Sequence, residues 1–259
     1  MDKCILQVEN LSKHYIIMQD GLSKKTVIDA VKNISFNLKK GDSLGLVGES
    51  GCGKTTVANL VLRLIEPSSG SVILFSDDVT YLNEAKMRRY RKDIQIVFQF
   101  SNSVLDPKMT VGELIQEPLK IHKIVDEKEY DAETNRILNM VGLSSSEKNK
   151  YPYQMSGGQN QRVIIARAIA TRPRIIVCDE PVASLDVSVQ GQILNLLQRL
   201  KVDMGLTYLF ITHDLKVVRH ICNRIAVMYK GEIVDIDSKD GILSNPHHKY
   251  TRQLLDSIL

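Results

Sequence analysis

A glycine-rich loop with one lysine is the stretch of this sequence best suited to hold phosphate. "GESGCGKTT", Gly48 to Thr56, fits the P-loop pattern Gly-x-x-x-x-Gly-Lys-Ser/Thr. Its glycines let backbone N–H groups converge on a phosphate, and the helix expected after it adds unpaired N–H groups. A plain glycine turn between a strand and a helix is the alternative. The full pattern in this setting favours a bound nucleoside triphosphate.

Each residue type in the loop has its own expected role. Lys54 supplies a positive charge for the β- and γ-phosphates, and the hydroxyl of Thr55 can bind Mg²⁺. The residues expected to contact the nucleotide are Gly48, Glu49, Ser50, Gly51, Cys52, Gly53, Lys54, Thr55 and Thr56.

The elements that must position this loop alternate between strands and helices. Strands are predicted at 5–9, 44–48, 71–75, 94–98, 174–179 and 207–212, with a hairpin over 224–237 around Lys230-Gly231. Apolar residues at three- and four-residue steps predict helices at 55–65, 159–170 and 188–200. Residues 101–155 lack convincing strands and show helical patterns around 110–121 and 128–142. The pattern predicts an α/β core with a helical insertion.

Composition sets limits on the class of protein. The chain has 259 residues, 43% hydrophobic and 25% charged, with a net charge of +4, too small to argue for nucleic acid. No apolar run approaches the roughly 20 residues that span a bilayer, and we expect no signal peptide. The four cysteines are scattered singly, which favours reduced thiols in a cytosolic protein.

The second half of the chain narrows the class of P-loop protein. No Asn-Lys-x-Asp guanine-reading motif is present, so GTP is not expected. "YQMSGGQNQRVIIARAIA" (153–170), "IIVCDEPVASLD" (175–186) and "FITHD" (210–214) follow in order. With the P-loop they resemble the ATP-binding cassette family over nearly the whole chain. Singly, each motif has an ordinary alternative: a surface turn, a helix start or a buried core histidine.

The resemblance implies a fold and its division. It implies a P-loop NTPase of the ABC ATPase fold, in which a RecA-like core with a mixed sheet is joined by an antiparallel β subdomain. The core and β subdomain are expected over 1–99 and 159–259, and a helical signature subdomain over 100–158, within one domain of 1–259.

The resemblance also implies roles for individual residues. Asp179 ends an apolar strand and would hold Mg²⁺, and Glu180 would orient and deprotonate the attacking water. His213, the switch histidine, would stabilise charge at the γ-phosphate. Gln99, the Q-loop residue, would sense Mg²⁺ and the γ-phosphate. Tyr15 would stack on adenine, although a half-buried strand residue is the alternative there.

The signature motif implies a partner. In this family, residues matching Ser156, Gly157, Gly158 and Gln159 bind the γ-phosphate of ATP held by another cassette, next to a D-loop residue that matches Asp186. This chain has one P-loop and one signature, so it would need a second cassette, which we expect to be a different chain.

Three stretches resemble the peptide/nickel importer subfamily: "GESGCGKTT", "DEPVASLDVSVQGQILNLLQ" (179–198) and "NPHHKYTRQLL" (245–255). This likeness implies an ATPase that energises uptake of peptides, nickel or a metal chelate. Its partners would be two integral membrane permease subunits and, indirectly, an extracytoplasmic binding protein, with the chain held at the cytoplasmic face of the membrane. Residues 100–102 and Asn160 depart from the subfamily pattern without removing a catalytic side chain.

Two other hypotheses keep the fold and change the function. One is a soluble cassette ATPase in a multi-enzyme complex such as phosphonate breakdown. The other is DNA repair or translation, for which the chain lacks a coiled coil, zinc cysteines or a second cassette.

Two further clusters of polar residues could form binding sites. The basic stretch "KMRRYRK" (86–92) could bind nucleic acid, but a solvated helical face is favoured, and no nucleic-acid partner is expected. His247-His248 could bind metal, but adjacent histidines do not easily share one ion, so they are expected to be surface residues.

Overall fold

The computed structural model describes residues 4–18, 25–98 and 104–256. They form two compact units: Met1–Arg88 with Thr207–Leu259, called unit 1 below, and Arg89–Leu206, called unit 2. Helix α2 (Glu84–Arg91) crosses the division between them along the chain.

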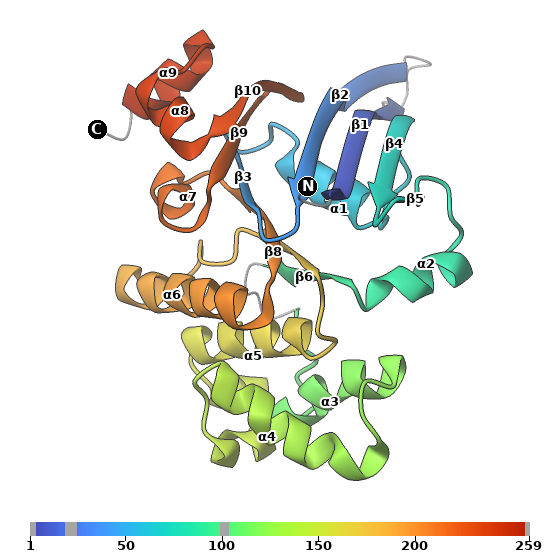
Figure 1. Cartoon of the computed structure of the whole chain (residues 1–259), viewed down its shortest axis with the longest axis vertical. Helices are drawn as coiled ribbons and strands as arrows, with labels where there is room; N and C mark the ends of the chain where they lie inside the picture. Colours follow the sequence, from blue (N-terminus) through green and yellow to red (C-terminus); the bar gives the residue numbers. More distant parts are fainter. Residues whose placement is uncertain (1–3, 19–24, 99–103, 257–259) are drawn as a thin grey trace. The chain divides into compact units, whose positions relative to one another are not determined.

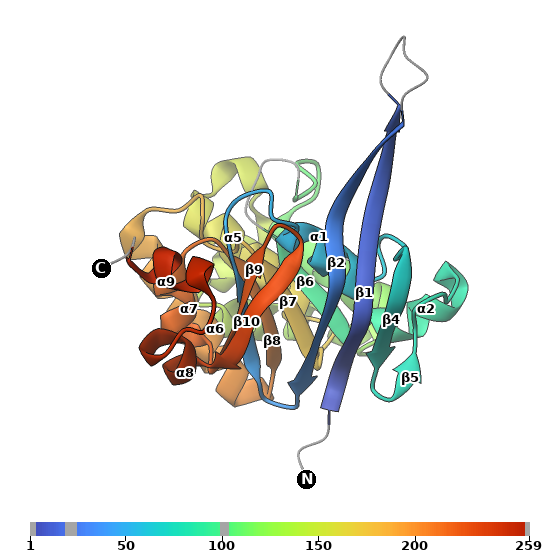
Figure 2. The ribbon, with the colours of Figure 1, turned by 90° about the horizontal axis from the view of Figure 1, so that it is seen from above.

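Unit 1 contains an antiparallel sheet of two long and two short strands. The long pair is β1 (Cys4–Met18) and β2 (Lys25–Lys39), followed by β4 (Ser69–Leu74) and β5 (Asp77–Asp78). The order is β2-β1-β4-β5, and β1, β2 and β4 lie side by side in Figure 2. Alternate residues of β1 and β2 are buried, among them Leu6, Val8, Phe36 and Leu38.

The second set of strands in unit 1 is mixed and carries the phosphate loop. It runs β10 (Glu232–Ser238), β9 (Arg224–Tyr229), β3 (Ser43–Val47) and β8 (Thr207–Thr212). β3 is parallel to both β8 and β9, whereas β9 and β10 form an antiparallel hairpin. β3 and β8 are buried along their whole length, as expected for parallel strands covered on both faces.

Four helices complete unit 1. α1 (Lys54–Val61) follows the phosphate loop, and α7 (Leu215–Ile221) follows β8. α8 (Lys239–Ser244) and α9 (Lys249–Asp256) follow β10 and lie beside the β9–β10 hairpin in Figures 1 and 2.

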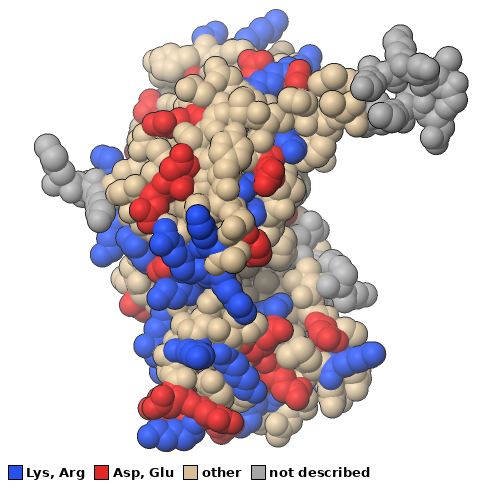
Figure 3. Space-filling model, turned by 90° about the vertical axis from the view of Figure 1, so that its right-hand side faces the viewer, with Lys and Arg blue, Asp and Glu red and all other residues tan. Residues whose placement is uncertain are grey.

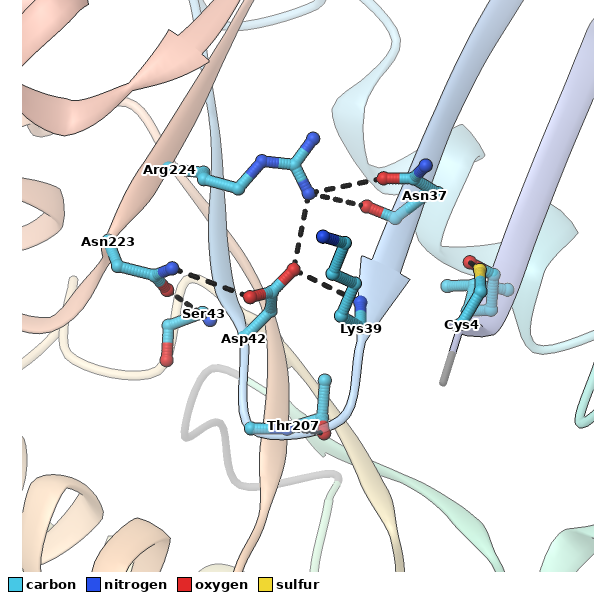
Figure 4. A network of polar contacts seen from close by, with 10 residues as sticks. Cys4, Asn37, Lys39, Asp42, Ser43, Thr207, Asn223 and Arg224 are labelled. Atoms are coloured by element: carbon cyan, nitrogen blue, oxygen red, sulfur yellow. Dashed lines mark hydrogen bonds and ion pairs between the residues drawn. The ribbon is translucent and has the colours of Figure 1, made fainter. Parts of the chain in front are cut away.

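A polar network fixes the turn between β2 and β3 (Figure 4). The Asp42 carboxylate accepts a hydrogen bond from the backbone N–H of Lys39 at 3.0 Å and pairs with Arg224 at 3.2 Å. Arg224 also donates to the Asn37 carbonyl at 2.9 Å. The side chain of Asn223 accepts from the Ser43 N–H at 2.6 Å. The network ties the end of β2 to the starts of β3 and β9.

Unit 2 combines two parallel strands with four long helices. β6 (Ile94–Phe98) is parallel to β7 (Ile175–Asp179). The helices are α3 (Val111–His122), α4 (Tyr130–Met140), α5 (Gly157–Ile169) and α6 (Val187–Met204). Short 3₁₀ turns lie at Glu127–Glu129, Ser145–Asn149 and Pro152–Gln154. α3, α4 and α5 pack together around buried side chains such as Leu114, Leu138 and Ile165 (Figure 1).

The elements predicted from the sequence are largely confirmed, with several differences. All the predicted strands, the 224–237 hairpin and the helices over 110–121 and 128–142 are present. However, β2 was not predicted, and β1 extends to Met18 where a strand over 5–9 was expected. Helix α1 ends at Val61 where a helix over 55–65 was expected, and helices α7, α8 and α9 were not predicted. The division into 1–99 with 159–259 and 100–158 stays a prediction. Within the described ranges, no helix has the length and apolar character needed to cross a membrane.

Candidate functional site

The phosphate loop joins β3 to α1 and needs glycine at two close approaches. A Cβ on Gly48 would lie 2.1 Å from the carbonyl oxygen of Met228, and one on Gly53 would lie 2.2 Å from that of Ala30. Gly53 also has φ 109°, in the left-handed region where side chains are disfavoured. Two glycines of the predicted motif are therefore required by packing against β2 and β9.

Lys54 lies inside the loop that it was predicted to serve. Its side chain is buried, and Nζ donates to the carbonyl oxygens of Gly48 and Glu49, both at 2.8 Å. The Cys52 sulfur lies 3.8 Å from the same ammonium group. Burial raises the pKa of the Cys52 thiol, so this cysteine is a protonated packing residue rather than a nucleophile.

The start of α1 suits an anion. No acidic residue lies in its first turn, and Gly53, which precedes it, has no side chain that could cap it, so the positive end of the helix dipole can attract phosphate. Ser50, Gly51 and Thr55 are exposed around it. An exposed hydroxyl beside such a site fits the hard oxygen ligands that Mg²⁺ prefers.

Strand register places His213 next to the phosphate loop. Val47 of β3 is paired with Thr212 of β8 in a parallel ladder. Gly48 and His213 follow these two residues directly, so they leave the sheet at the same edge. His213 is exposed there. His213 and the phosphate loop thus lie at the same strand edge within unit 1, and the role of His213 at the γ-phosphate stays a prediction.

Tyr15 lies on the part of unit 1 that adjoins the same loop. It pairs with Ile28 across the β1–β2 ladder, and Ala30, two residues further along β2, contacts Gly53. The Tyr15 residue is 40% exposed, and the Lys13 ammonium lies 5.3 Å from the centroid of its ring. This is a surface-accessible aromatic ring; its stacking on adenine stays a prediction.

The two carboxylates lie at the corresponding strand end in unit 2. Asp179 is the buried last residue of β7 and is paired with Phe98 of β6. Glu180 follows with φ 50°, a conformation that costs a non-glycine residue energy and often marks a functional position. Gln99, which follows Phe98 in the chain, lies outside the described residues. The register therefore places Phe98 and Asp179 side by side at one edge of the sheet, where Glu180 follows.

The signature motif forms the N-terminus of α5. The Ser156 hydroxyl accepts from the Gln159 N–H at 3.3 Å, and the Gln159 side chain accepts from the Ser156 N–H at 2.9 Å, a complete capping box. Gln159 also donates to Glu147 at 2.6 Å. Gly157 and Gly158 form the first turn, and Ser156 is exposed. The arrangement presents a helix N-terminus that can accept an anion.

The expected D-loop residue starts the next helix. Asp186 precedes α6, and its backbone oxygen accepts from the Gln190 N–H at 2.8 Å. Its side chain is exposed and makes no cap hydrogen bond to α6.

Sequence reasoning missed a link between α5 and the segment before Gln99. Gln161 is fully buried, and its Nε2 donates to the carbonyl of Phe98 at 3.2 Å. Among the described residues its Oε1 has no hydrogen-bond partner. In the sequence, this link could have been recognised only from a polar glutamine, two positions after Gln159, on the otherwise apolar face of the predicted helix. The neighbouring Asn160, noted as unusual, donates to the Pro152 carbonyl at 2.9 Å.

The structure groups the predicted residues by unit. Unit 1 holds Tyr15, the loop from Gly48 to Thr56, and His213. Unit 2 holds the signature residues Ser156 to Gln159, together with Asp179, Glu180 and Asp186.

The basic stretch 86–92 lies largely on helix α2. On α2, Met87 and Tyr90 are buried, whereas Lys86, Arg88 and Arg89 are exposed. Acidic side chains lie among the basic ones on the face shown in Figure 3, as for a solvated surface. Within the described ranges, no group of three or more His, Cys, Asp or Glu side chains could hold a metal ion.

The prediction that His247 and His248 are both surface residues is correct only for His247. His247 is exposed, but His248 is half-buried. The Nδ1 atom of His248 accepts a hydrogen bond from the Tyr250 N–H at 3.1 Å, at the start of α9.

Comparisons with known proteins agree on one family. A family model described as ABC transporter matches residues 31–183. The oligopeptide transport ATP-binding protein AppF of Bacillus subtilis (strain 168) is 43% identical over 257 residues, covering 98% of this chain and 78% of AppF. The glutathione import ATP-binding protein GsiA of Escherichia coli (strain K12) is 43% identical over 255 residues, covering 98% of this chain and 41% of GsiA.

Solved structures give the same result. The dimeric ATP-binding cassette MJ0796, bound to ADP and Pi, is 30% identical, with a TM-score of 0.78 over 90% of this chain and 98% of that chain. The structure of cbiO1 from Clostridium perfringens, described as part of the ABC transporter complex cbiONQ, is 27% identical with a TM-score of 0.81, covering 95% and 92%. The predicted α/β P-loop fold is confirmed, and the chain belongs to the ABC transporter family.

Proposed function

We propose that this chain is the ATP-hydrolysing subunit of an importer that takes up short peptides through a separate membrane permease. The observation that carries the proposal is the register at two strand ends. In unit 1, Val47 pairs with Thr212, so the phosphate loop and His213 begin at the same edge of the sheet. In unit 2, Phe98 pairs with Asp179, next to Glu180. ATP hydrolysis needs groups of these types: a loop that binds phosphate, a positive charge, a base and a ligand for Mg²⁺.

The expected work of each group follows from its chemistry. Lys54 and the N–H groups of the loop and α1 would bind the β- and γ-phosphates. Thr55 and Asp179 would hold Mg²⁺, which supplies charge neutralisation at the phosphates. Glu180 would accept a proton from water, and His213 would stabilise charge on the γ-phosphate.

The substrate class is proposed from the relatives. AppF is named for oligopeptide transport and GsiA for import of glutathione, itself a tripeptide. Nickel and metal chelates remain within the subfamily that the sequence resembles. The soluble multi-enzyme complex is less favoured, because these relatives are named as transport or import proteins.

A groove in unit 2 supports a permease partner. It has a volume of about 290 Å³, and its lining combines apolar residues such as Phe98, Pro118 and Ile121 with the polar residues Gln95, Glu117, His122 and Arg167. Phe98 and Ile121 are 38% and 53% exposed. A cytoplasmic segment of the permease would bury these side chains. Such docking would hold the chain at the cytoplasmic face of the membrane.

The test is co-purification in mild detergent from the native cells, with an affinity tag on this chain. We expect two integral membrane proteins and a second, different cassette in the complex. Ile121→Asp should release the permease while leaving ATP binding unchanged. Val202→Asp, at an 82% exposed position on α6, is the matched control and should leave the complex intact. Recovery of soluble enzymes in place of membrane proteins would contradict the proposal.

A further inference from the structure

The segment "NPHHKYTRQLL" (245–255) contacts the phosphate loop, a connection that the predicted motif roles do not use. Tyr250 of α9 is buried, and its hydroxyl oxygen accepts a hydrogen bond from the backbone N–H of Glu49 at 3.0 Å. Glu49 directly follows Gly48 in the loop. The two residues are 201 positions apart in sequence, so the contact links the end of the chain to the nucleotide site.

The Tyr250 side chain is held in place from the strand below it. Its ring stacks on Tyr229 of β9, with the centroids 4.2 Å apart and the planes at 28°. Burial raises the pKa of the Tyr250 hydroxyl, so the group is neutral at physiological pH. The hydroxyl position is therefore set by the stacked ring rather than by a flexible side chain.

The start of α9 is fixed to β10 by one buried carboxylate. Asp235 accepts from the backbone N–H of His248 at 2.8 Å and from the hydroxyl of Thr251. His248 Nδ1 in turn accepts from the Tyr250 N–H. Three side-chain contacts within four residues thus determine where Tyr250 lies relative to the sheet.

A second contact holds the other part of the loop. The backbone N–H of Gly231, in the turn between β9 and β10, donates to the carbonyl of Cys52 at 3.1 Å. The loop is therefore anchored at Glu49 by α9 and at Cys52 by the hairpin. The residues between these anchors, Ser50 and Gly51, are exposed.

We infer that Tyr250 is a positioning residue for the nucleotide site: its hydroxyl orders the phosphate loop before ATP arrives. The inference rests on the proposed function, because it requires that the loop bind ATP. A loop that is ordered only part of the time binds more weakly, in proportion to its competent fraction. Removing the anchor at Glu49 should therefore weaken nucleotide binding. By linkage, bound nucleotide should in turn stabilise α9.

The variant that tests this is Tyr250→Phe, which removes the hydroxyl and keeps the ring on Tyr229. The Kd for AMP-PNP with Mg²⁺, measured calorimetrically on the full chain, should rise roughly 3- to 10-fold, the effect of one lost hydrogen bond. Wild type should show slower amide exchange over 249–256 when AMP-PNP is bound, and this protection should be reduced in the variant.

The matched control is Thr207→Val. Thr207 is fully buried, and its hydroxyl accepts from the Gly41 N–H at 2.9 Å, near the turn shown in Figure 4. It begins β8, at the opposite end of that strand from His213. The same kind of hydrogen bond is lost in the same unit, so Thr207→Val should lower the melting temperature without changing the Kd.

The outcomes separate the two proposals. A raised Kd in Tyr250→Phe alone supports the positioning role. Unchanged Kd and exchange in Tyr250→Phe, with only a lower melting temperature, would leave Tyr250 a structural residue and overturn the inference. Failure of the wild-type chain to bind AMP-PNP would instead overturn the proposed function.

Discussion

At the scale of single residues, Glu180 provides the clearest test of the proposed chemistry. Its carboxyl group follows a buried strand and its backbone has φ 50°, so the surrounding structure fixes it in a costly conformation. Glu180→Gln should leave ATP binding intact and lower turnover by roughly 10²–10⁴-fold, the usual contribution of a positioned base. The measurement is phosphate release with the permease and partner cassette present, beside the nucleotide Kd. Normal turnover would remove Glu180 from its role.

Lys54 should affect binding rather than the chemical step alone. Its ammonium group donates to the Gly48 and Glu49 carbonyls and is the buried positive charge of the loop. Lys54→Ala should weaken ATP binding by roughly 1.5–3 kcal/mol, the range for hydrogen bonds to charged groups. Calorimetric titration checks this. Lys40→Ala, at an exposed position, should bind as wild type does, and equal affinities for all three proteins would refute the prediction.

Motif residues could be predicted from the sequence because their chemistry depends on local spacing. Gly48, Gly53 and Lys54 lie within seven positions, and their requirement for glycine or charge is visible in the pattern. Tyr250 could not be assigned in this way. Its hydroxyl acts on a backbone N–H 201 positions away, and no local pattern encodes a contact that only the tertiary fold creates.

At the scale of elements, regular patterns were predicted well and irregular ones were missed. Strands β3, β7 and β8 are apolar throughout, so their type was evident. β2 was missed because its alternation is clear only near its end, at Ile34, Phe36 and Leu38. Elsewhere the β1–β2 pairing shifts register between Val8 and His14, which breaks the two-residue period that identifies a strand.

Helix α4 carries an ion pair whose effect on stability should depend on pH. Glu133 is buried, and hydrogen bonds from Arg136, with a further contribution from Arg172, lower the pKa of its carboxyl from 4.5 to about 2. Because the folded pKa lies below the unfolded one, the stabilisation is present above pH 4.5 and is lost as pH falls toward 2. Half-exposed arginine partners limit the contribution to about 1–3 kcal/mol.

The corresponding variant is Glu133→Gln. Its free energy of unfolding in urea should be about 1–3 kcal/mol below wild type at pH 7, and the gap should shrink at pH 3. Glu127→Gln, at an exposed position in the preceding 3₁₀ turn, should differ little from wild type at either pH. A gap that is the same at both pH values would show that the carboxylate charge is not the cause.

At the scale of the whole molecule, the chain carries one phosphate loop and one signature motif. In the composite site that we propose, the N-terminus of α5 would contact ATP held by a second cassette, and Ser156 is exposed there. A composite ATP site therefore predicts that two cassettes associate when ATP is bound. This association can be measured without measuring transport.

The Glu180→Gln chain, mixed with its partner cassette and MgATP, should form a stable cassette pair that separates when ATP is removed, because ATP then joins the two subunits without being hydrolysed. Adding Ser156→Arg should abolish the pair, since the large side chain occupies the position from which the serine would contact phosphate. Ser144→Arg is the matched control, because Ser144 also caps a turn in unit 2, through Ser146, but lies outside the signature. Size-exclusion chromatography with light scattering measures how much of each variant forms the pair. If the Ser156→Arg chain pairs as well as the Ser144→Arg chain does, α5 has no role in binding the partner's ATP.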